Sequence, residues 1–151
     1  MKLTQNLLCS MFIAATVATP VWAALGGDAT SVQNDLAKMK GALRISASPQ
    51  GYEVHEITTS YGTVVREYLN PAGKVFALGW DGPFNPDLRQ VLGTYYTQYT
   101  QAPASAHQDR AHLRIAQPGL VVQISGRVRA FVGRAWAPDL LPANFSTDDI
   151  K

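Results

Sequence analysis

The sequence predicts an α+β domain in which an antiparallel sheet of about six strands carries two helices packed on one face. Short segments rich in β-branched and aromatic residues, bounded by glycine and proline, occur in two groups. They span residues 52–59, 63–69 and 75–80 in the first group and 112–116, 120–124 and 128–136 in the second. A segment with the apolar spacing of a helix precedes each group. Strands that follow one another through tight turns pair as hairpins, so the sheet is expected to be antiparallel.

Two segments carry the helical pattern. The first is expected to begin at Thr30 or Ser31, followed by Gln33 in a capping-box pattern, and to end at Gly41. The second has Asn85 as the expected N-cap and Pro86 as the expected first helical residue. Its apolar side chains recur at helical spacing in Leu88, Val91, Leu92, Tyr95 and Tyr99.

A short repeated sequence pattern raises the question of whether a unit of one helix and three strands is duplicated. Residues 73–77 (GKVFA) resemble residues 126–130 (GRVRA). Pro-Asp-Leu follows each of them at almost the same interval, at 86–88 and at 138–140. Two short matches also arise by chance, so duplication stays open, and the fold class does not depend on it.

The first 23 residues have the features of a cleaved export signal. Lys2 precedes an apolar run from Leu7 to Ala18, which is too short to span a bilayer comfortably. The small side chains of Val21 and Ala23 predict cleavage after Ala23. We therefore expect residues 24–151 to form a single α+β domain, periplasmic or secreted, with no membrane span after the signal is removed.

Composition and motifs argue against several classes of function. The formal net charge is +2 and no run of lysine or arginine occurs, so no nucleic-acid partner is expected. The one cysteine lies in the signal, which leaves no disulfide and no cysteine-based metal site. His55, His107 and His112 lack the spacing of converging metal ligands, and no metal site is expected. No glycine-rich phosphate loop or G-x-S-x-G elbow occurs, and no cofactor is expected.

The hairpin between the first two strands has a register that follows from its charges. Residues 60–62 predict a three-residue loop with a left-handed glycine. Glu56 then lies opposite Arg66, and His55 lies opposite Glu67. A two-residue loop would instead place Glu56 opposite Glu67, a like-charge pair that is unfavourable across strands.

The next hairpin decides which side chains surround these pairs. Residues 71–73 predict a second three-residue loop, which sets Tyr68 against Phe76, Arg66 against Leu78 and Val64 against Trp80. On this register the Glu56–Arg66 pair lies among aromatic side chains on one face of the sheet. The His55–Glu67 pair lies on the other face.

The sequence supports hypotheses of different classes. The leading one is a non-enzymatic module that binds a protein, peptide or glycan of the cell envelope, with Glu56, Arg66, Trp80 and Tyr96 as candidate binding residues. The alternative is a small hydrolase or lyase that uses His55 with Glu67 or Glu56 as acid and base. A structural envelope protein is the third. Both ion pairs also have the simpler role of fixing strand register.

The chain also resembles a known family. The resemblance is carried by GTVVREYLNPAGKVFALGWDGPFNPDLRQVLGTYY, by the earlier LGGDATSV and by the later GRVRAFVGRAWAPDLLP. Together these segments are similar to domain-of-unknown-function family 2844, a set of small exported proteins of Gram-negative bacteria. The resemblance implies an exported single-domain protein, and it implies no particular activity, cofactor or catalytic residue.

Overall fold

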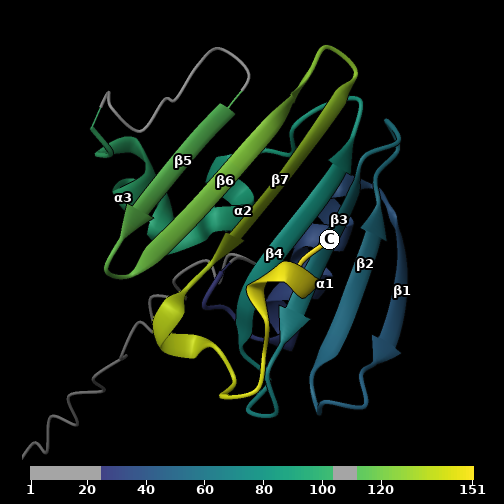
Figure 1. Cartoon of the computed structure of the whole chain (residues 1–151). Coiled ribbons are helices and arrows are strands. Elements are labelled where there is room, and N and C mark those ends of the chain that lie inside the picture. The colour runs from purple at the N-terminus through teal and green to yellow at the C-terminus, as the bar shows by residue number, and fades with distance from the viewer. Residues whose placement is uncertain (1–24, 104–111) are drawn as a thin grey trace, which may run out of the picture.

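The computed structural model describes residues 25–103 and 112–151 (Figure 1). The predicted signal at residues 1–23 and His107 lie outside the described residues. Helices are α1 (Ala29–Met39), α2 (Leu88–Leu92) and α3 (Tyr96–Thr100), with single turns η1 (Gly93–Tyr95), η3 (Pro138–Leu140) and η4 (Thr147–Asp149). Strands are β1 (Ala42–Ala47), β2 (Glu53–Thr58), β3 (Val64–Leu69), β4 (Val75–Gly82), β5 (His112–Gln117), β6 (Leu120–Arg127) and β7 (Ala130–Trp136).

All seven strands form one antiparallel sheet in the order β1-β2-β3-β4-β7-β6-β5. The prediction of an α+β antiparallel sheet is confirmed, but the strand count of about six is wrong by one. The additional strand is β1, which pairs along its whole length with β2. The sequence alternates Leu43 and Ile45 with Arg44 and Ser46, which indicates a possible short strand before the turn-like residues 46–51, but five of the six residues are exposed because β1 is an edge strand.

The helices begin and end at other residues than the sequence predicts. Asp28, and not Thr30 or Ser31, caps α1 by accepting a hydrogen bond from the Ser31 amide. Lys40 closes this helix in a left-handed conformation, one residue before Gly41. The GGD sequence before the helix hides this cap, because aspartate is also common in turns.

The second helical segment is broken rather than continuous. Asp87 caps α2 by accepting from the amides of Arg89 and Gln90. Gly93, with φ 51° and ψ −121°, ends α2. Asn85 is not the N-cap, because its side chain accepts a hydrogen bond from the indole of Trp80 at 3.0 Å.

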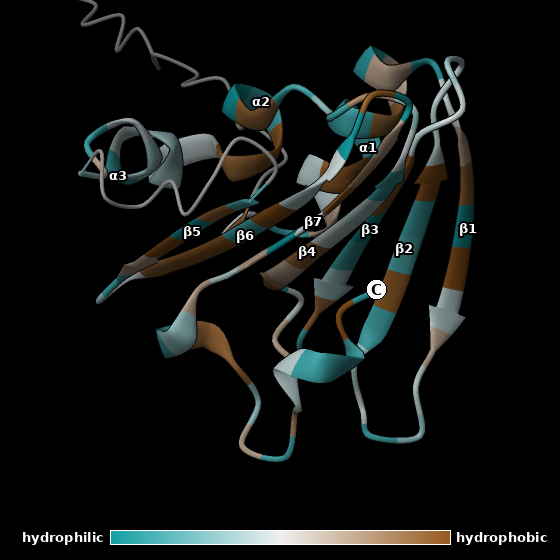
Figure 2. Ribbon diagram, turned by 45° about the horizontal axis from the view of Figure 1, so that its top comes forward, coloured by the Kyte–Doolittle hydropathy of each residue, from teal (hydrophilic) through white to brown (hydrophobic). Residues whose placement is uncertain are grey.

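The sheet has two differently covered faces. The helices lie on one face, which we call the helix face, and the segment 137–151 lies on the other, which we call the tail face (Figure 2). The main core fills the helix face with Val32, Ile57, Leu78, Trp80 and Leu92 among its buried members. A smaller core lies under the tail segment, where the rings of Tyr52, Tyr68, Phe76 and Phe145 meet with centroids 4.7 to 6.2 Å apart.

The register of β2 with β3 is as predicted. Glu56 lies opposite Arg66 and His55 opposite Glu67. The loop at 60–62 carries Gly62 at φ 87°, in the left-handed region that a glycine adopts without strain. The cross-strand charges therefore predict the correct loop length.

The register of β3 with β4 is not as predicted. The loop at 71–73 forms, and Leu69 lies opposite Val75, but a bulge follows and shifts the remaining pairs by one residue. Tyr68 lies opposite Ala77, Arg66 opposite Gly79, Val65 opposite Trp80 and Val64 opposite Asp81. Because one residue of shift moves a side chain to the other face, Leu78 and Trp80 lie on the helix face.

The second meander, β5 to β7, differs from its prediction in its last turn. Strand β6 continues through Ser125-Gly126 to Arg127, and the turn is Val128-Arg129, with Arg129 at φ 65°. The third strand of each group, β4 or β7, lies at the centre, and the two pair with each other. This arrangement agrees with a duplicated unit, and duplication itself stays a prediction.

Candidate functional site

A half-exposed charged cluster lies on the tail face at the middle of β2, β3 and β4. Arg66 donates from Nε to Glu56 at 2.9 Å and from Nη1 to Asp81 at 2.5 Å. The exposed fraction of the side chain is 21% for Arg66, 32% for Glu56 and 49% for Asp81. Partial burial alone would lower the pKa of Arg66, but hydrogen bonds and charges from Asp81 and Glu56 outweigh it and raise the pKa above its ordinary value. The guanidinium is therefore fixed in place and remains charged.

A shallow hollow of about 350 Å³ opens beside this cluster. Glu56 and Arg66 line it together with Tyr52, Val54 and Tyr68. Tyr52 is half-buried, whereas Tyr68 is 3% exposed. The hollow therefore combines charged hydrogen-bonding groups with an aromatic wall, which is the composition of a surface that holds a ligand.

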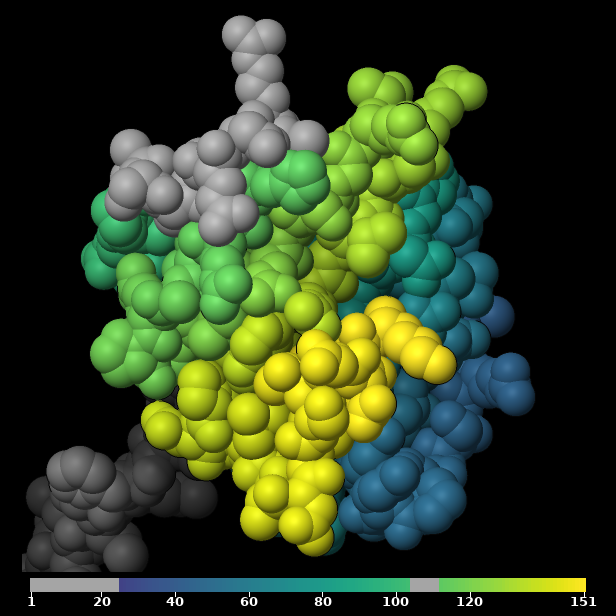
Figure 3. All heavy atoms as spheres, in the orientation of Figure 1, coloured from purple at the N-terminus to yellow at the C-terminus, as the bar shows by residue number. Residues whose placement is uncertain are grey.

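The tail segment forms the other wall of this hollow, and Tyr68 holds it in place. The phenol of Tyr68 donates to the carbonyl of Asp149 at 3.3 Å and accepts from the amide of Lys151 at 3.0 Å. Gly79 on β4 allows the close contact, because a Cβ there would lie 2.0 Å from the Lys151 carbonyl oxygen. In Figure 3 the end of this segment lies between β5–β7 and β1–β3.

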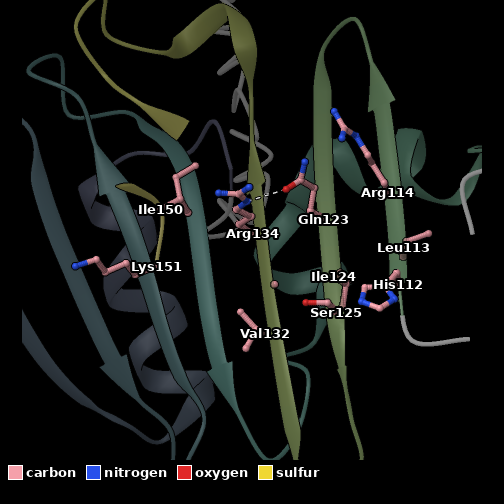
Figure 4. Close-up of a pocket in the computed structure, with 11 residues that line it drawn as sticks. His112, Leu113, Arg114, Gln123, Ile124, Ser125, Val132, Arg134, Ile150 and Lys151 are labelled. Carbon is pink, nitrogen blue, oxygen red and sulfur yellow. Dashed lines mark hydrogen bonds between the residues drawn. The ribbon is translucent and has the colours of Figure 1, made fainter. Parts of the chain in front are cut away.

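A second hollow, of about 420 Å³, lies on the other side of the tail segment, over β5, β6 and β7 (Figure 4). Its polar lining includes Arg114, Gln123 and Arg134, and Lys151 lines both hollows. Arg134 donates from Nε to Gln123 Oε1 at 2.8 Å and from Nη1 to the Thr147 carbonyl at 3.0 Å. Its guanidinium also lies 5.7 Å from the Trp136 ring centroid.

The helix face carries a buried acidic pair. Asp35 of α1 and Glu67 of β3 are both fully buried, and Gln90 of α2 donates to Asp35 Oδ1. Among the described residues neither oxygen of Glu67 has a hydrogen-bond partner, and Asp35 is the acidic side chain whose charge acts on it. Burial raises the pKa of Asp35 to about 6, and burial with the charge of Asp35 raises the pKa of Glu67 well above its ordinary value.

The structure brings Glu56 and Arg66 together but places the other predicted binding residues, Trp80 and Tyr96, elsewhere. Trp80 is fully buried on the helix face, and Tyr96 on α3 packs on the same core with its ring 5.8 Å from that of Tyr99. Neither lines a hollow with Glu56 and Arg66 on the tail face.

His55 lies opposite Glu67 on the helix face, 4% exposed, and its Nε2 lies 3.2 Å from Glu53 Oε2. Glu56 is on the tail face, so it does not form an acid–base pair with His55.

Asp81 and Asp35 were not predicted from the sequence, whereas Arg134, with the other arginines of the C-terminal half, was interpreted as a solvated strand residue rather than as part of an anionic ligand site. Asp81 was hidden by the β4 bulge. Asp35 could have been found, because it lies on the apolar stripe of the first helix with Val32, Leu36 and Met39. The position of Arg134 beside β4 follows from the pairing of β4 with β7, which the local sequence pattern does not predict.

In the part of the chain that the structure describes, no group of three or more histidine, cysteine or acidic side chains is placed to hold a metal ion. Within the same residues, no helix combines the length and apolar character that crossing a bilayer requires.

Fold and surface together define an α+β protein with one antiparallel sheet, covered by helices on one face and partly by its own tail segment on the other. The chain belongs to the family described as "Protein of unknown function (DUF2844)", whose model matches residues 21–150. The family resemblance drawn from the sequence is therefore confirmed. Comparison with curated proteins and with solved structures gives no match.

Proposed function

We propose that this protein is a non-enzymatic binding module of the cell envelope, and that its protein, peptide or glycan ligand binds the tail-face hollow beside Glu56 and Arg66. One observation carries the proposal. The Arg66 guanidinium is fixed between two carboxylates at the edge of an open hollow that has tyrosines in its wall. Such preorganised charge beside aromatic surface favours binding without large ordering costs.

The catalytic alternative has less support. His55 and Glu67 are 4% and 0% exposed and face the helices, and neither lines either of the two hollows described above. An acid and a base must come within hydrogen-bonding reach of a substrate. A buried pair of this kind has a simpler role in the packing of α1 on the sheet.

The proposal includes export of the domain from the cytoplasm. The signal at residues 1–23 would deliver the domain to the periplasm or the medium after cleavage behind Ala23. The exported protein should then begin at Ala24. Intact-mass measurement of protein recovered from the host periplasm checks this, and a mass that retains Trp22 would contradict it.

The binding role is tested with mature protein as bait in envelope extract. The decisive variant is the Glu56→Gln/Arg66→Met double substitution, since Arg66→Met alone takes the cationic partner from both Glu56 and Asp81. Arg127→Met, on an exposed strand end outside both hollows, is the matched control.

A component retained by the wild type and by Arg127→Met, but lost from the folded double variant, supports the proposal. Equal retention by all three proteins would mean that the Glu56–Arg66 pair only fixes strand register.

A further inference from the structure

Seven residues form a straight row across the tail face, one from each strand of the sheet. Each member lies directly opposite the next in the strand registers. From the β1 edge to the β5 edge the row reads Arg44, Glu56, Arg66, Gly79, Arg134, Gln123 and Arg114. With strands about 4.8 Å apart, the row is roughly 29 Å long. Four of the seven members are therefore arginines that cross the sheet at right angles to its strands.

The positive charge of this row is not evenly neutralised. Arg66 is bonded to two carboxylates, so its part of the row has no cationic excess. Arg134 has one acidic neighbour, Asp148, whose side chain is 89% exposed and lies 3.7 Å away. Arg114 is exposed and has no acidic partner among the residues that the structure describes. The cationic excess therefore lies over β5 to β7.

This excess coincides with the 420 Å³ hollow between those strands and the tail segment (Figure 4). Gln123 Oε1 is used by Arg134, which leaves the Gln123 amide NH₂ as a donor. Ser125 adds a hydroxyl, and Val132, 52% exposed, adds an apolar patch. The lining therefore offers cations, neutral hydrogen-bonding groups and apolar surface together.

We propose that this hollow binds an acidic polysaccharide, a chain of carboxylated sugars lying across β5, β6 and β7. Arg134 and Arg114 are two strands apart, about 10 Å, so they reach two carboxylates of one chain. Gln123 and Ser125 lie near the same path and suit sugar hydroxyls, while Val132, which is 52% exposed, suits the C–H face of a ring.

An acidic peptide fits this surface less well. Peptides that bind sheets usually pair with an edge strand, whereas this row crosses the strands. The proposal does not depend on the Glu56–Arg66 hollow being a binding site.

The test is calorimetric titration of the mature chain with an oligogalacturonate, whose neutral methyl ester is the ligand control. Arg114→Gln is the decisive variant, because Arg114 is exposed and makes none of the described ion pairs. Arg44→Gln is the matched control, an exposed arginine on the same row at the opposite edge and outside both hollows.

We expect the acid form to bind and the methyl ester not to bind. Arg114→Gln should weaken binding roughly tenfold, the loss of one charge-assisted contact, and Arg44→Gln less than about twofold. Absence of binding by the acid form would overturn the proposal. So would equal weakening by both variants, which indicates unspecific charge attraction, or tighter binding of polyglutamate, which indicates an acidic peptide.

Discussion

Replacement of Glu67 by glutamine should stabilise the protein at alkaline pH and leave its stability unchanged in acid. Glu67 and Asp35 are both fully buried, and among the described residues neither Asp35 Oδ2 nor either oxygen of Glu67 has a hydrogen-bond partner. When both are ionised, two unscreened negative charges face each other. A glutamine at this position keeps the shape, donates from its amide to Asp35 and removes one of the buried charges.

The size of the effect follows from the raised pKa values. The pKa of Asp35 rises from 3.8 to about 6, because burial and the charge of Asp87 outweigh the opposing effects of Gln90, Glu67 and Lys38. A folded-state pKa above the unfolded one means that the native state holds its proton more tightly. This contribution to stability is complete below about pH 4 and is lost as the pH rises through 6. At roughly 1.4 kcal/mol per pH unit the loss is about 3 kcal/mol for this carboxyl.

The pKa of Glu67 is also raised, so loss of its proton adds to the cost at higher pH. His55, opposite Glu67, and Glu53, whose carboxylate lies 3.2 Å from His55 Nε2, are unchanged in the variant. Glu67→Gln should therefore raise the free energy of unfolding by roughly 1–3 kcal/mol at about pH 8 and by less than about 0.5 kcal/mol at about pH 4.5.

Urea unfolding followed by tryptophan fluorescence at these two pH values measures the difference. Asp139→Asn, which removes an exposed carboxyl, is the matched control and should show no dependence on pH in this range. If Glu67→Gln gives the same change in stability at both pH values, or destabilises the protein more at pH 8 than at pH 4.5, then charge repulsion between Asp35 and Glu67 is not what limits stability at alkaline pH.

Two further predictions concern close contacts at glycine. Gly79→Ala should release the tail segment, because its Cβ would lie 2.0 Å from the Lys151 carbonyl oxygen. Amide hydrogen exchange at residues 147–151 should then be faster. Unchanged exchange would contradict this contact. Gly133→Ala would place its Cβ 2.1 Å from the ring of Trp80 and should cost about 1–3 kcal/mol in urea unfolding, whereas full stability would mean that the ring moves aside. Gly119→Ala, whose Cβ would meet the flexible Gln98 side chain at 3.2 Å, is the control for both and should cost little.

Turn chemistry and charge were enough to predict the hairpin of β2 and β3. The left-handed Gly62 and the need to avoid a Glu56–Glu67 pair both select the same loop length. The local pattern also gave the second loop correctly, since Leu69 does lie opposite Val75. Where turns and cross-strand charges constrain a segment, the sequence is therefore sufficient.

The predicted register of β3 with β4 is wrong from Tyr68 onward, because nothing in the sequence marks the bulge. The first six residues of β4 are all buried, so they form a continuous apolar run without alternation. Such a run fits either register, and only alternation or charge distinguishes them. This error changed the predicted binding residues, because the predicted register placed Trp80 on the tail face and did not place Asp81 beside Arg66.

The alignment of the four arginines in the row across the tail face could not be predicted from the sequence for a different reason. It joins residues of all seven strands, and its two halves meet only through the pairing of β4 with β7. That pairing is long-range and is determined by the packing of the whole sheet. Each arginine alone has the pattern of a solvated strand residue, and only the assembled registers show that four of them are aligned.

The β4 bulge has a consequence for both faces at once. Phe76 and Ala77 lie together in the smaller core, and the pairs beyond them are shifted by one residue. Without the shift, Asp81 would lie on the helix face among apolar side chains, and Trp80 would leave the main core. With it, Trp80 packs over Gly133, Gly79 admits the tail segment, and Asp81 binds Arg66. One inserted residue thus allows a continuous apolar core and a charged tail face in the same sheet, and both hollows lie on that charged face.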